Sequence, residues 1–480
     1  MLSLFYLLLL SLVGLVQALS TGGNRLLVVL EEVGEKSKYS KFWNDLETRG
    51  YKLIFESPKN EKLSLFEHGD RAFDHLILLP PKSKGLGPAL TPALLLKFLN
   101  SEGNILLALS STSPTPAAVS SLLLELDIQL PPEKTSLTVD HFNYDTLSSS
   151  EKHDVLVLPR PGALRPDVRE FFHGDAKEDG AIAFPRAVGQ VLGNTSPLLA
   201  PVLRAPSTAY AYDTKEDAET AEEPFATGEQ LSLVSTLQAR NAARFTVVGS
   251  VESLADEWFN GKIKKSAGVD KAGKGEKKQG TANQDFFKQL SAWTFKEIGI
   301  LKVGKVEHSL SEDAGKRSGN NSALGAGDPN PKIYRVKNDV TFSIELMEYK
   351  YDSYHPFELP ASDDLQLEFS MLSPFHRLSL RPSETTVNST KYTTSFTLPD
   401  QHGIFNFRVN YKRPFLSTVD EKRTVTVRHF AHDEWPRSWR ISGAWVWIGG
   451  IWVTVGGWLV FVALWLWSAP VKGISIKKSQ

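Results

Sequence analysis

The stretch RLLVVLEE, residues Arg25 to Glu32, decides the fold class of the N-terminal region. Its apolar run is continuous, which is typical of a strand buried on both faces of a parallel sheet. In the following segment, residues 38–50, Phe42, Trp43 and Leu46 fall on one helical stripe, and a glycine ends the segment. A buried strand followed by an amphipathic helix predicts an α/β fold.

Strands and helices keep alternating along the chain. Further strands are expected at 51–57, 75–80 and 104–110, and helices at 90–103 and 115–128. This order predicts a doubly wound parallel sheet, with a first Rossmann-like unit over residues 24–150. A strand at 243–250 and a helix at 283–299 continue the pattern, so we expect one α/β region over 24–305, with 151–305 as the continuation.

Two polar stretches interrupt this pattern. Residues 261–280 are rich in lysine and glycine, which favours a solvated surface loop over the alternative of a basic interaction patch. Residues 306–333 are expected to be a flexible linker. Short alternating segments separated by turn residues then predict a β-sandwich-like domain over 334–430. The chain has no cysteine, so packed cores and not disulfides must stabilise these regions.

Both ends of the chain carry apolar segments. Residues 1–18 read as a signal peptide, because an apolar run is followed by Val16-Gln17-Ala18, a pattern suited to cleavage after Ala18. An uncleaved anchor helix is the alternative. Residues 441–467 contain no charged side chain, which predicts a transmembrane helix and argues against a buried core helix. Together the two segments predict type I topology, with a lumenal body and a cytosolic tail over 468–480.

The tail and the lumenal body carry further address and modification patterns. Lys477 and Lys478 match the dilysine pattern by which coat proteins return membrane proteins to the endoplasmic reticulum; a plain basic tail is the alternative. Candidate glycosylation sites are Asn194, Asn320 and Asn388. The net charge of −1 gives no reason to expect a nucleic-acid partner.

Reactive-site patterns are missing from the sequence. It has no dinucleotide fingerprint, phosphate-binding loop, nucleophile elbow or metal-ligand spacing, so we expect no catalytic, cofactor or metal residues. Glu31 and Ser111 follow predicted strands, and the segment VDHF supplies His141. These three are candidate glycan contacts in a crevice at the strand ends; polar loop residues that merely cap strand and helix ends are the favoured alternative. In the membrane segment, Gly443, Gly450 and Gly457 recur every seven residues and predict a helix-packing face; the general frequency of glycine in membrane helices is the alternative explanation.

Several blocks resemble the DDOST family in the order in which that family carries them. These blocks are RLLVVLEE at 25–32, LQARNAARFTVVGSVESLADEWFN at 237–260, FFKQLSAWTFKEIGILKVGKVEHS at 286–309, DDLQLEF at 363–369, SPFHR at 373–377, LPDQHGIFNFRVNYKR at 398–413 and HDEWPR at 432–437. The resemblance covers nearly the whole length of the chain.

The resemblance implies a non-catalytic subunit of the endoplasmic-reticulum oligosaccharyltransferase complex, which transfers oligosaccharide from dolichyl diphosphate to asparagine in Asn-x-Ser/Thr. It also implies ribophorin II-type, DAD-type and catalytic subunits as partners. A lumenal lectin or cargo receptor cycling between the endoplasmic reticulum and the Golgi is the alternative, and an enzymatic α/β domain is a third hypothesis.

Overall fold

The computed structural model describes residues 19–60, 62–83, 85–133, 136–173, 180–213, 224–266, 279–311, 329–434 and 444–468. The predicted signal peptide and residues 469–480 of the predicted cytosolic tail lie outside the described residues, and so do Asn320, Gly443, Lys477 and Lys478. The chain divides into two compact units, residues 1–427 and 428–480, which are described separately.

A nine-stranded sheet organises the α/β region. Its parallel part has the order β2-β1-β5-β6-β15, which in sequence order is 2-1-3-4-5, the flavodoxin-like winding. These strands are β1 (Arg25–Val29), β2 (Lys52–Glu56), β5 (His75–Leu78), β6 (Asn104–Ala108) and β15 (Arg244–Val248). The prediction of a doubly wound parallel sheet is therefore confirmed.

Helices cover both faces of this sheet. Leu26 and Val28 point into the core beneath α2 (Ser40–Thr48) and α6 (Asn283–Thr294). Leu27 and Val29 point into the opposite core, beneath α3 (Pro92–Asn100) and α4 (Ala117–Glu125). Because successive side chains of a strand point to opposite faces, a sheet covered on both sides requires the continuous apolar run that the sequence shows.

Antiparallel strands extend the sheet beyond β15. The extension consists of β14 (Leu231–Gln238), β11 (Gln190–Leu192), β7 (Ile128–Gln129) and β12 (Leu199–Arg204). Two-stranded sheets are β3 (Phe66–Glu67) with β4 (Asp70–Arg71), β8 (Ser136–Val139) with β13 (Tyr210–Asp213), β9 (Val155–Leu158) with β10 (Ile182–Pro185), and β16 (Lys262–Ile263) with β17 (Gln279–Gly280). Short helices are η1 (Val33–Tyr39), η2 (Pro88–Leu90), η3 (Gly228–Gln230), η4 (Glu252–Leu254) and α5 (Asp256–Phe259).

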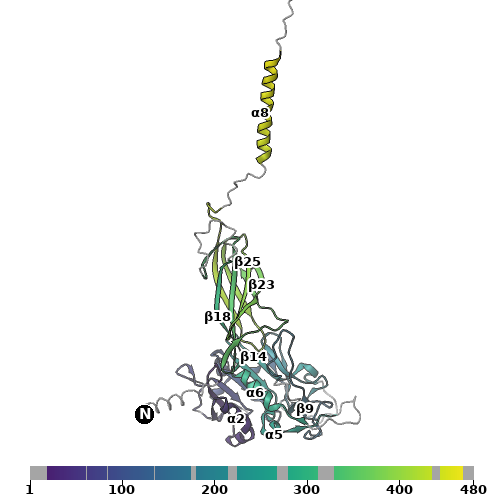
Figure 1. Cartoon of the computed structure of the whole chain (residues 1–480). Helices are drawn as coiled ribbons and strands as arrows, with labels where there is room; N and C mark the ends of the chain where they lie inside the picture. Colours follow the sequence, from purple (N-terminus) through teal and green to yellow (C-terminus); the bar gives the residue numbers. More distant parts are fainter. Residues whose placement is uncertain are drawn as a thin grey trace, which may run out of the picture. The chain divides into compact units, whose positions relative to one another are not determined.

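Two five-stranded antiparallel sheets form the sandwich (Figure 1). One sheet contains β18 (Ile298–Leu310), β20 (Asp339–Lys350), β25 (Thr390–Thr397), β24 (Arg381–Thr385) and β21 (Ser353–Pro356). The other contains β19 (Ile333–Arg335), β27 (Val419–Arg428), β26 (Gly403–Tyr411), β22 (Gln366–Ser370) and β23 (Pro374–Ser379). Aromatic rings fill the space between them; the ring centroids of Phe342 and Phe407, one from each sheet, lie 5.5 Å apart.

Strand β18 joins the two regions. It starts inside the segment predicted as α/β and continues into the predicted linker, and it pairs with β20 from Ile298↔Lys350 to Leu310↔Val340. Its backbone hydrogen bonds are therefore made within the sandwich.

Buried polar contacts strengthen this join. The Arg244 guanidinium, which is fully buried, donates to the carbonyl oxygens of Ile298 and Gly299 at 2.7 Å each, and also to that of Trp293. The Trp293 Nε1–H donates to the Phe415 oxygen at 2.7 Å. Burial lowers the pKa of Arg244 to about 9, and the guanidinium remains the cation that satisfies these three carbonyls.

The second unit contains helix α8 (Ala444–Trp467), whose 24 residues have a mean hydropathy of 1.9 over the most apolar window. Length and composition make it a candidate membrane span, as the sequence predicts. Gly450 and Gly457 lie in this helix, and a Cβ added at either would meet no atom within 4 Å in the described chain.

Candidate functional site

A crevice opens at the carboxyl ends of the parallel strands, where doubly wound sheets usually bind ligands. Its volume is about 640 Å³. The residues that follow the ends of four parallel strands line it: Leu30 after β1, Leu79 after β5, Ser110 after β6 and Val251 after β15. The crevice includes the gap between β1 and β5, which is the point at which the strand order reverses. The fold therefore builds a site at its topological switch point.

Charged side chains of both signs line this crevice. Glu35 forms ion pairs with Lys38 at 3.2 Å and with Lys82 at 3.3 Å. Partial burial would raise the pKa of Glu35, but the hydrogen bonds from these two lysines outweigh it and lower the pKa. Across the crevice Arg186 pairs with Glu252 at 2.8 Å. Balanced charge of this kind suits a neutral polar ligand better than a strongly charged one.

Hydroxyl groups and aromatic rings complete the lining. The hydroxyl oxygens of Ser110 and Thr112 are 2.7 Å apart and form a hydrogen bond. Another loop adds the hydroxyls of Ser148, Ser149 and Ser150. Tyr39 and Trp258 contribute rings. Hydroxyls and carboxylates can bind a carbohydrate through hydrogen bonds, and the partly exposed Trp258 ring can stack on a sugar face, whereas Tyr39 is buried.

The three predicted glycan contacts do not line this crevice. The Glu31 carboxylate accepts from Lys59 Nζ at 2.6 Å and from the backbone N–H groups of Lys82 and Ser83, so it fixes the loop that follows β5. The hydrogen bond from Lys59 is the main reason why the pKa of Glu31 is lowered. Ser111 is half-buried between two crevice residues.

His141 lies apart from the other two, after β8. Its Nδ1 is 2.7 Å from His153 Nδ1, and its Nε2 is 3.0 Å from the Tyr210 hydroxyl. The His153 ring in turn stacks on Tyr144 with ring centroids 3.8 Å apart. The structure thus brings Glu31 and Ser111 near the crevice rim and engages His141 in a separate aromatic cluster.

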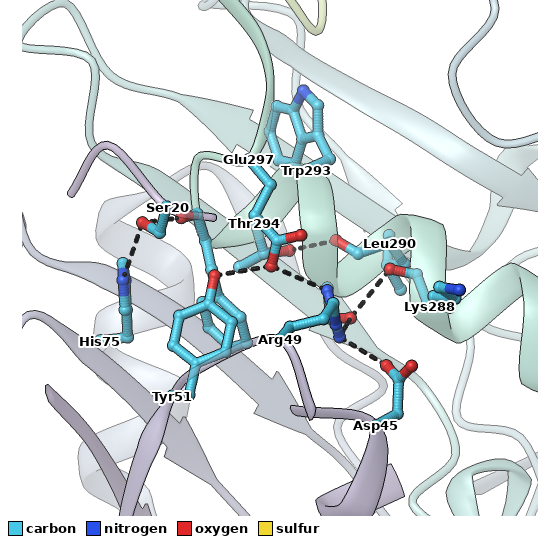
Figure 2. A network of polar contacts seen from close by, with 12 residues as sticks. Ser20, Asp45, Arg49, Tyr51, His75, Lys288, Leu290, Trp293, Thr294 and Glu297 are labelled. Carbon is cyan, nitrogen blue, oxygen red and sulfur yellow. Dashed lines mark hydrogen bonds and ion pairs between the residues drawn. The ribbon is translucent and has the colours of Figure 1, made fainter. Parts of the chain in front are cut away.

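Sequence reasoning missed a second constellation, made of Ser20, His75 and Asn104 (Figure 2 shows the first two). Ser20 Oγ lies 3.2 Å from His75 Nε2, and Asn104 Nδ2 lies 3.0 Å from His75 Nδ1. The order of side chains resembles a nucleophile, a base and an orienting group. Such a triad requires that the serine hydroxyl donate to an unprotonated imidazole nitrogen.

The hydrogen bonds around His75 rule out that role. Asn104 Oδ1 accepts from the Arg244 N–H at 3.0 Å, so the Asn104 amide nitrogen faces His75 and donates to Nδ1. The His75 proton then lies on Nε2, which donates to the Gly23 oxygen at 3.0 Å. Ser20 Oγ donates to the Phe295 oxygen at 2.5 Å. Neither imidazole nitrogen has a free lone pair, so His75 cannot act as a base.

Burial reinforces this arrangement. His75 is fully buried, and desolvation lowers its pKa to about 4, so the ring is neutral at neutral pH. Among the residues that the structure describes, no group of three or more His, Cys, Asp or Glu side chains is placed to hold a metal ion. Of the candidate glycosylation sites, Asn194 and Asn388 are exposed.

Comparisons with known proteins place the chain in a family. Residues 17–297 match the model of the OST48 N-terminal domain, and residues 318–469 match that of the OST48 middle domain. The dolichyl-diphosphooligosaccharide–protein glycosyltransferase subunit wbp1 of Schizosaccharomyces pombe is 32% identical over 401 residues, which cover 83% of this chain and 82% of the relative. The 48 kDa subunit of the same transferase from Danio rerio is 32% identical over 417 residues, covering 87% of this chain and 86% of the relative.

Solved structures are much more distant. A carbohydrate deacetylase, Agd3, matches 47% of this chain and 29% of its own with 8% identity and a TM-score of 0.26, which bears on neither fold nor function. The family models and the curated relatives, in contrast, extend over most of the chain. The resemblance inferred from the sequence blocks is confirmed, and the chain belongs to the OST48 family of dolichyl-diphosphooligosaccharide–protein glycosyltransferase subunits.

Proposed function

We propose that this chain is a non-catalytic subunit of the endoplasmic-reticulum oligosaccharyltransferase complex and supports the transfer of oligosaccharide to asparagine. The observation that carries the proposal is the match to subunits of this transferase over more than four-fifths of both chains. The state of His75 agrees with an accessory role, because its Nδ1 accepts from Asn104 and its Nε2 donates to the Gly23 oxygen, so the Ser20–His75 pair cannot act as a nucleophile and base.

Isolation of the complex tests this function against the lectin or cargo-receptor alternative. The chain should migrate on blue-native gels only within a large assembly, together with the other transferase subunits. Depleting it should leave sequons of reporter glycoproteins unmodified. A chain that runs free, with reporter glycosylation intact after depletion, would contradict the subunit role.

Helix α8 is the proposed contact with specific partners, of the ribophorin II, DAD and catalytic types. Gly450 and Gly457 lie two turns apart on one face, where the absence of side chains lets another helix approach. Leucine at both positions should release the chain from the complex. The matched control is Val455→Leu, which adds bulk to the opposite face of the same helix.

Topology and retrieval form a separate part of the proposal. We infer a type I orientation, with export directed by residues 1–18 and a tail in the cytosol that offers Lys477 and Lys478 to coat proteins. Protease added to sealed microsomes should remove only the tail. Replacing both lysines with serine should send a fraction of unassembled chain to the Golgi, detectable by Golgi-type processing of its own glycans.

The crevice is the proposed contact with carbohydrate. Its hydroxyls and the Trp258 ring are better placed for this than the predicted set of Glu31, Ser111 and His141. The variant Thr112→Ala/Trp258→Ala should slow oligosaccharide transfer by the intact complex, whereas Glu31→Gln/Ser111→Ala/His141→Ala should have a smaller effect. Equal transfer rates for the unaltered protein and both variants would contradict carbohydrate binding in the crevice.

A further inference from the structure

The segment from Leu19 to Gly22 is bound against two helix ends. The Leu19 backbone N–H donates to the Arg49 oxygen at 3.4 Å, and the Thr21 N–H and hydroxyl both donate to the Lys296 oxygen at 3.2 Å. Between them Ser20 Oγ donates to the Phe295 oxygen and reaches His75 (Figure 2). Three consecutive residues are thus held by contacts to residues far away in the sequence.

The acceptors share one electrostatic property. Arg49 follows the last residue of α2, and Phe295 and Lys296 follow the last residue of α6. Carbonyl groups at the C-terminal end of a helix lack donors from their own helix and form the negative pole of its dipole. The nitrogen of Leu19 therefore occupies a position that favours a positive charge.

A buried carboxylate lies in the hydrogen-bonded network beside these helix ends. Glu297 is fully buried, its Oε1 accepts from Tyr51 at 2.7 Å and from Arg49 at 2.8 Å, and its Oε2 has no hydrogen-bond partner within the described part of the chain. Figure 2 shows the hydrogen bonds of Glu297 with Tyr51 and Arg49. Tyr51 also interacts with Ser20, so the carboxylate is connected to the bound segment.

The path of the segment is fixed on its far side by two glycines. A Cβ on Gly22 would lie 3.2 Å from His75 Cε1. Gly23 has a φ of +115°, and a Cβ there would lie 2.3 Å from Asp74 Oδ2. These close approaches restrict the backbone path into β1 and so hold Leu19 within hydrogen-bond distance of the Arg49 carbonyl.

We propose that this surface is a binding site for the chain's own α-amino group, created at Leu19 when the signal peptide is removed. An endoprotease uses water to break the bond between the Ala18 carbonyl carbon and the Leu19 nitrogen. The hydroxyl group of water goes to Ala18 as part of its new carboxyl group, and the remaining hydrogen of water goes to the Leu19 nitrogen. The resulting amine takes up the proton that the carboxyl group releases and becomes an ammonium group. One N–H donor is thereby replaced by three and a positive charge, at the ends of α2 and α6.

This inference depends on the signal peptide that is part of the proposed function. Processing supplies a group that completes the fold, so the mature N-terminus is a structural part of the α/β region. A tag or extension left in front of Leu19 would move the charge away from the Arg49 carbonyl.

An amine-selective label tests the site in the intact complex. Full-length chain is isolated with its partners from detergent-solubilised microsomes, and mass spectrometry of its first peptide should identify Leu19 with a free α-amino group. Labelling with 2-pyridinecarboxaldehyde, which reacts with α-amines, should be at least about tenfold slower in the native complex than after denaturation, because reaction requires the segment to open.

Two variants distinguish docking from simple crowding. Ser20→Ala/Thr21→Val removes side-chain contacts without changing the α-amine, and it should bring the native labelling rate at least threefold closer to the denatured rate. The control Ser37→Ala removes an exposed hydroxyl that donates to the carbonyl oxygen of Gly34, and it should leave the labelling rate unchanged.

Three results would overturn the proposal. The first is a native labelling rate equal to the denatured rate, the second is a mature N-terminus other than Leu19, and the third is protection that the Ser20/Thr21 variant retains in full. Each leaves the proposed function standing as long as the transferase subunits still co-purify with the chain, whereas loss of co-purification in the unaltered protein would count against that function instead.

Discussion

The α/β region and the sandwich bury charge in different ways. In the α/β region Arg49, Arg244 and Glu297 are buried and linked to helix ends and strand carbonyls. In the sandwich the ion pair of Arg408 with Asp420 lies at the surface, with both side chains 43% exposed, and aromatic rings fill the interior. A parallel sheet covered on both faces places the ends of its helices inside the protein, and these ends need polar partners. The sandwich satisfies its backbone through strand pairing, and its buried carboxylate Glu348 lies on β20 where Arg169 of the α/β region reaches it.

The largest expected effect comes from Arg244. Replacing it with methionine keeps most of the volume but leaves the carbonyls of Trp293, Ile298 and Gly299 without their donor, so we expect a loss of about 3 kcal/mol or more in unfolding free energy. Chemical unfolding of the full-length chain in detergent measures it. If the loss is no greater than for Arg408→Met, burial of charge does not distinguish the two regions.

Acid should weaken both regions, and His75 gives the clearest case. Its pKa is about 4 when folded and about 6.5 when unfolded, so the unfolded chain takes up a proton first as the pH falls below about 6.5. Stability is therefore complete above that pH and declines by about 3 kcal/mol as the pH approaches 4. Burial lowers the pKa of His308 in the sandwich to about 4 as well, with the same sign.

Unfolding at pH 7 and at pH 4.5 checks this prediction. His75→Gln should reduce the difference between the two pH values for the α/β region, and His308→Gln should do so for the sandwich. A pH difference that neither variant changes would assign the acid sensitivity to other groups.

A smaller effect is expected at the join between the regions. Arg169 forms an ion pair with Glu348 of β20, a fully buried carboxylate that also has Lys350 at 3.5 Å. Arg169→Ala should cost about 2 kcal/mol, because Arg169 is partly exposed while its partner is not. Hydrogen exchange should speed up in residues 160–172 and at the Lys350 end of β20; Arg377→Ala, at a surface pair, is the control.

The smallest effect is expected within the sandwich surface. Arg408→Ala removes the ion pair with Asp420, and we expect less than about 1 kcal/mol because water screens both partners. Thermal melting at low and high salt should differ little between variant and wild type. A loss comparable to that of Arg244→Met would remove the contrast between the regions.

Local patterns predicted much of the fold. The strands near Arg25, His75 and Asn104 and the helix carrying Phe42, Trp43 and Leu46 are where the sequence places them, because burial on one or both faces leaves a readable period. The end of the α/β region was harder to predict. Ile298–Leu310 has the alternation of a strand, but alternation does not reveal which sheet the strand joins, and β18 pairs with the later strand β20.

The candidate site was less predictable for the same reason. The position of the crevice follows from the strand order, and Glu31 and Ser111 lie next to its lining. His141 belongs to another cluster, because the path of the chain after β8 depends on long-range pairing with β13. Arg244 opens a strand that is otherwise uncharged, and that charge was the available signal for the buried network. The contacts of Ser20 could not be inferred, since its partners lie 55 and 275 residues away.

Strand β18 also has a mechanical consequence. It leaves the end of α6 after three residues and runs for 13 residues, about 40 Å, along β20. A pull along this direction would load the interstrand hydrogen bonds together, in shear, and would not peel them open one at a time. The sandwich should therefore behave as a stiff rod fixed to the α/β region, able to transmit tension without lengthening.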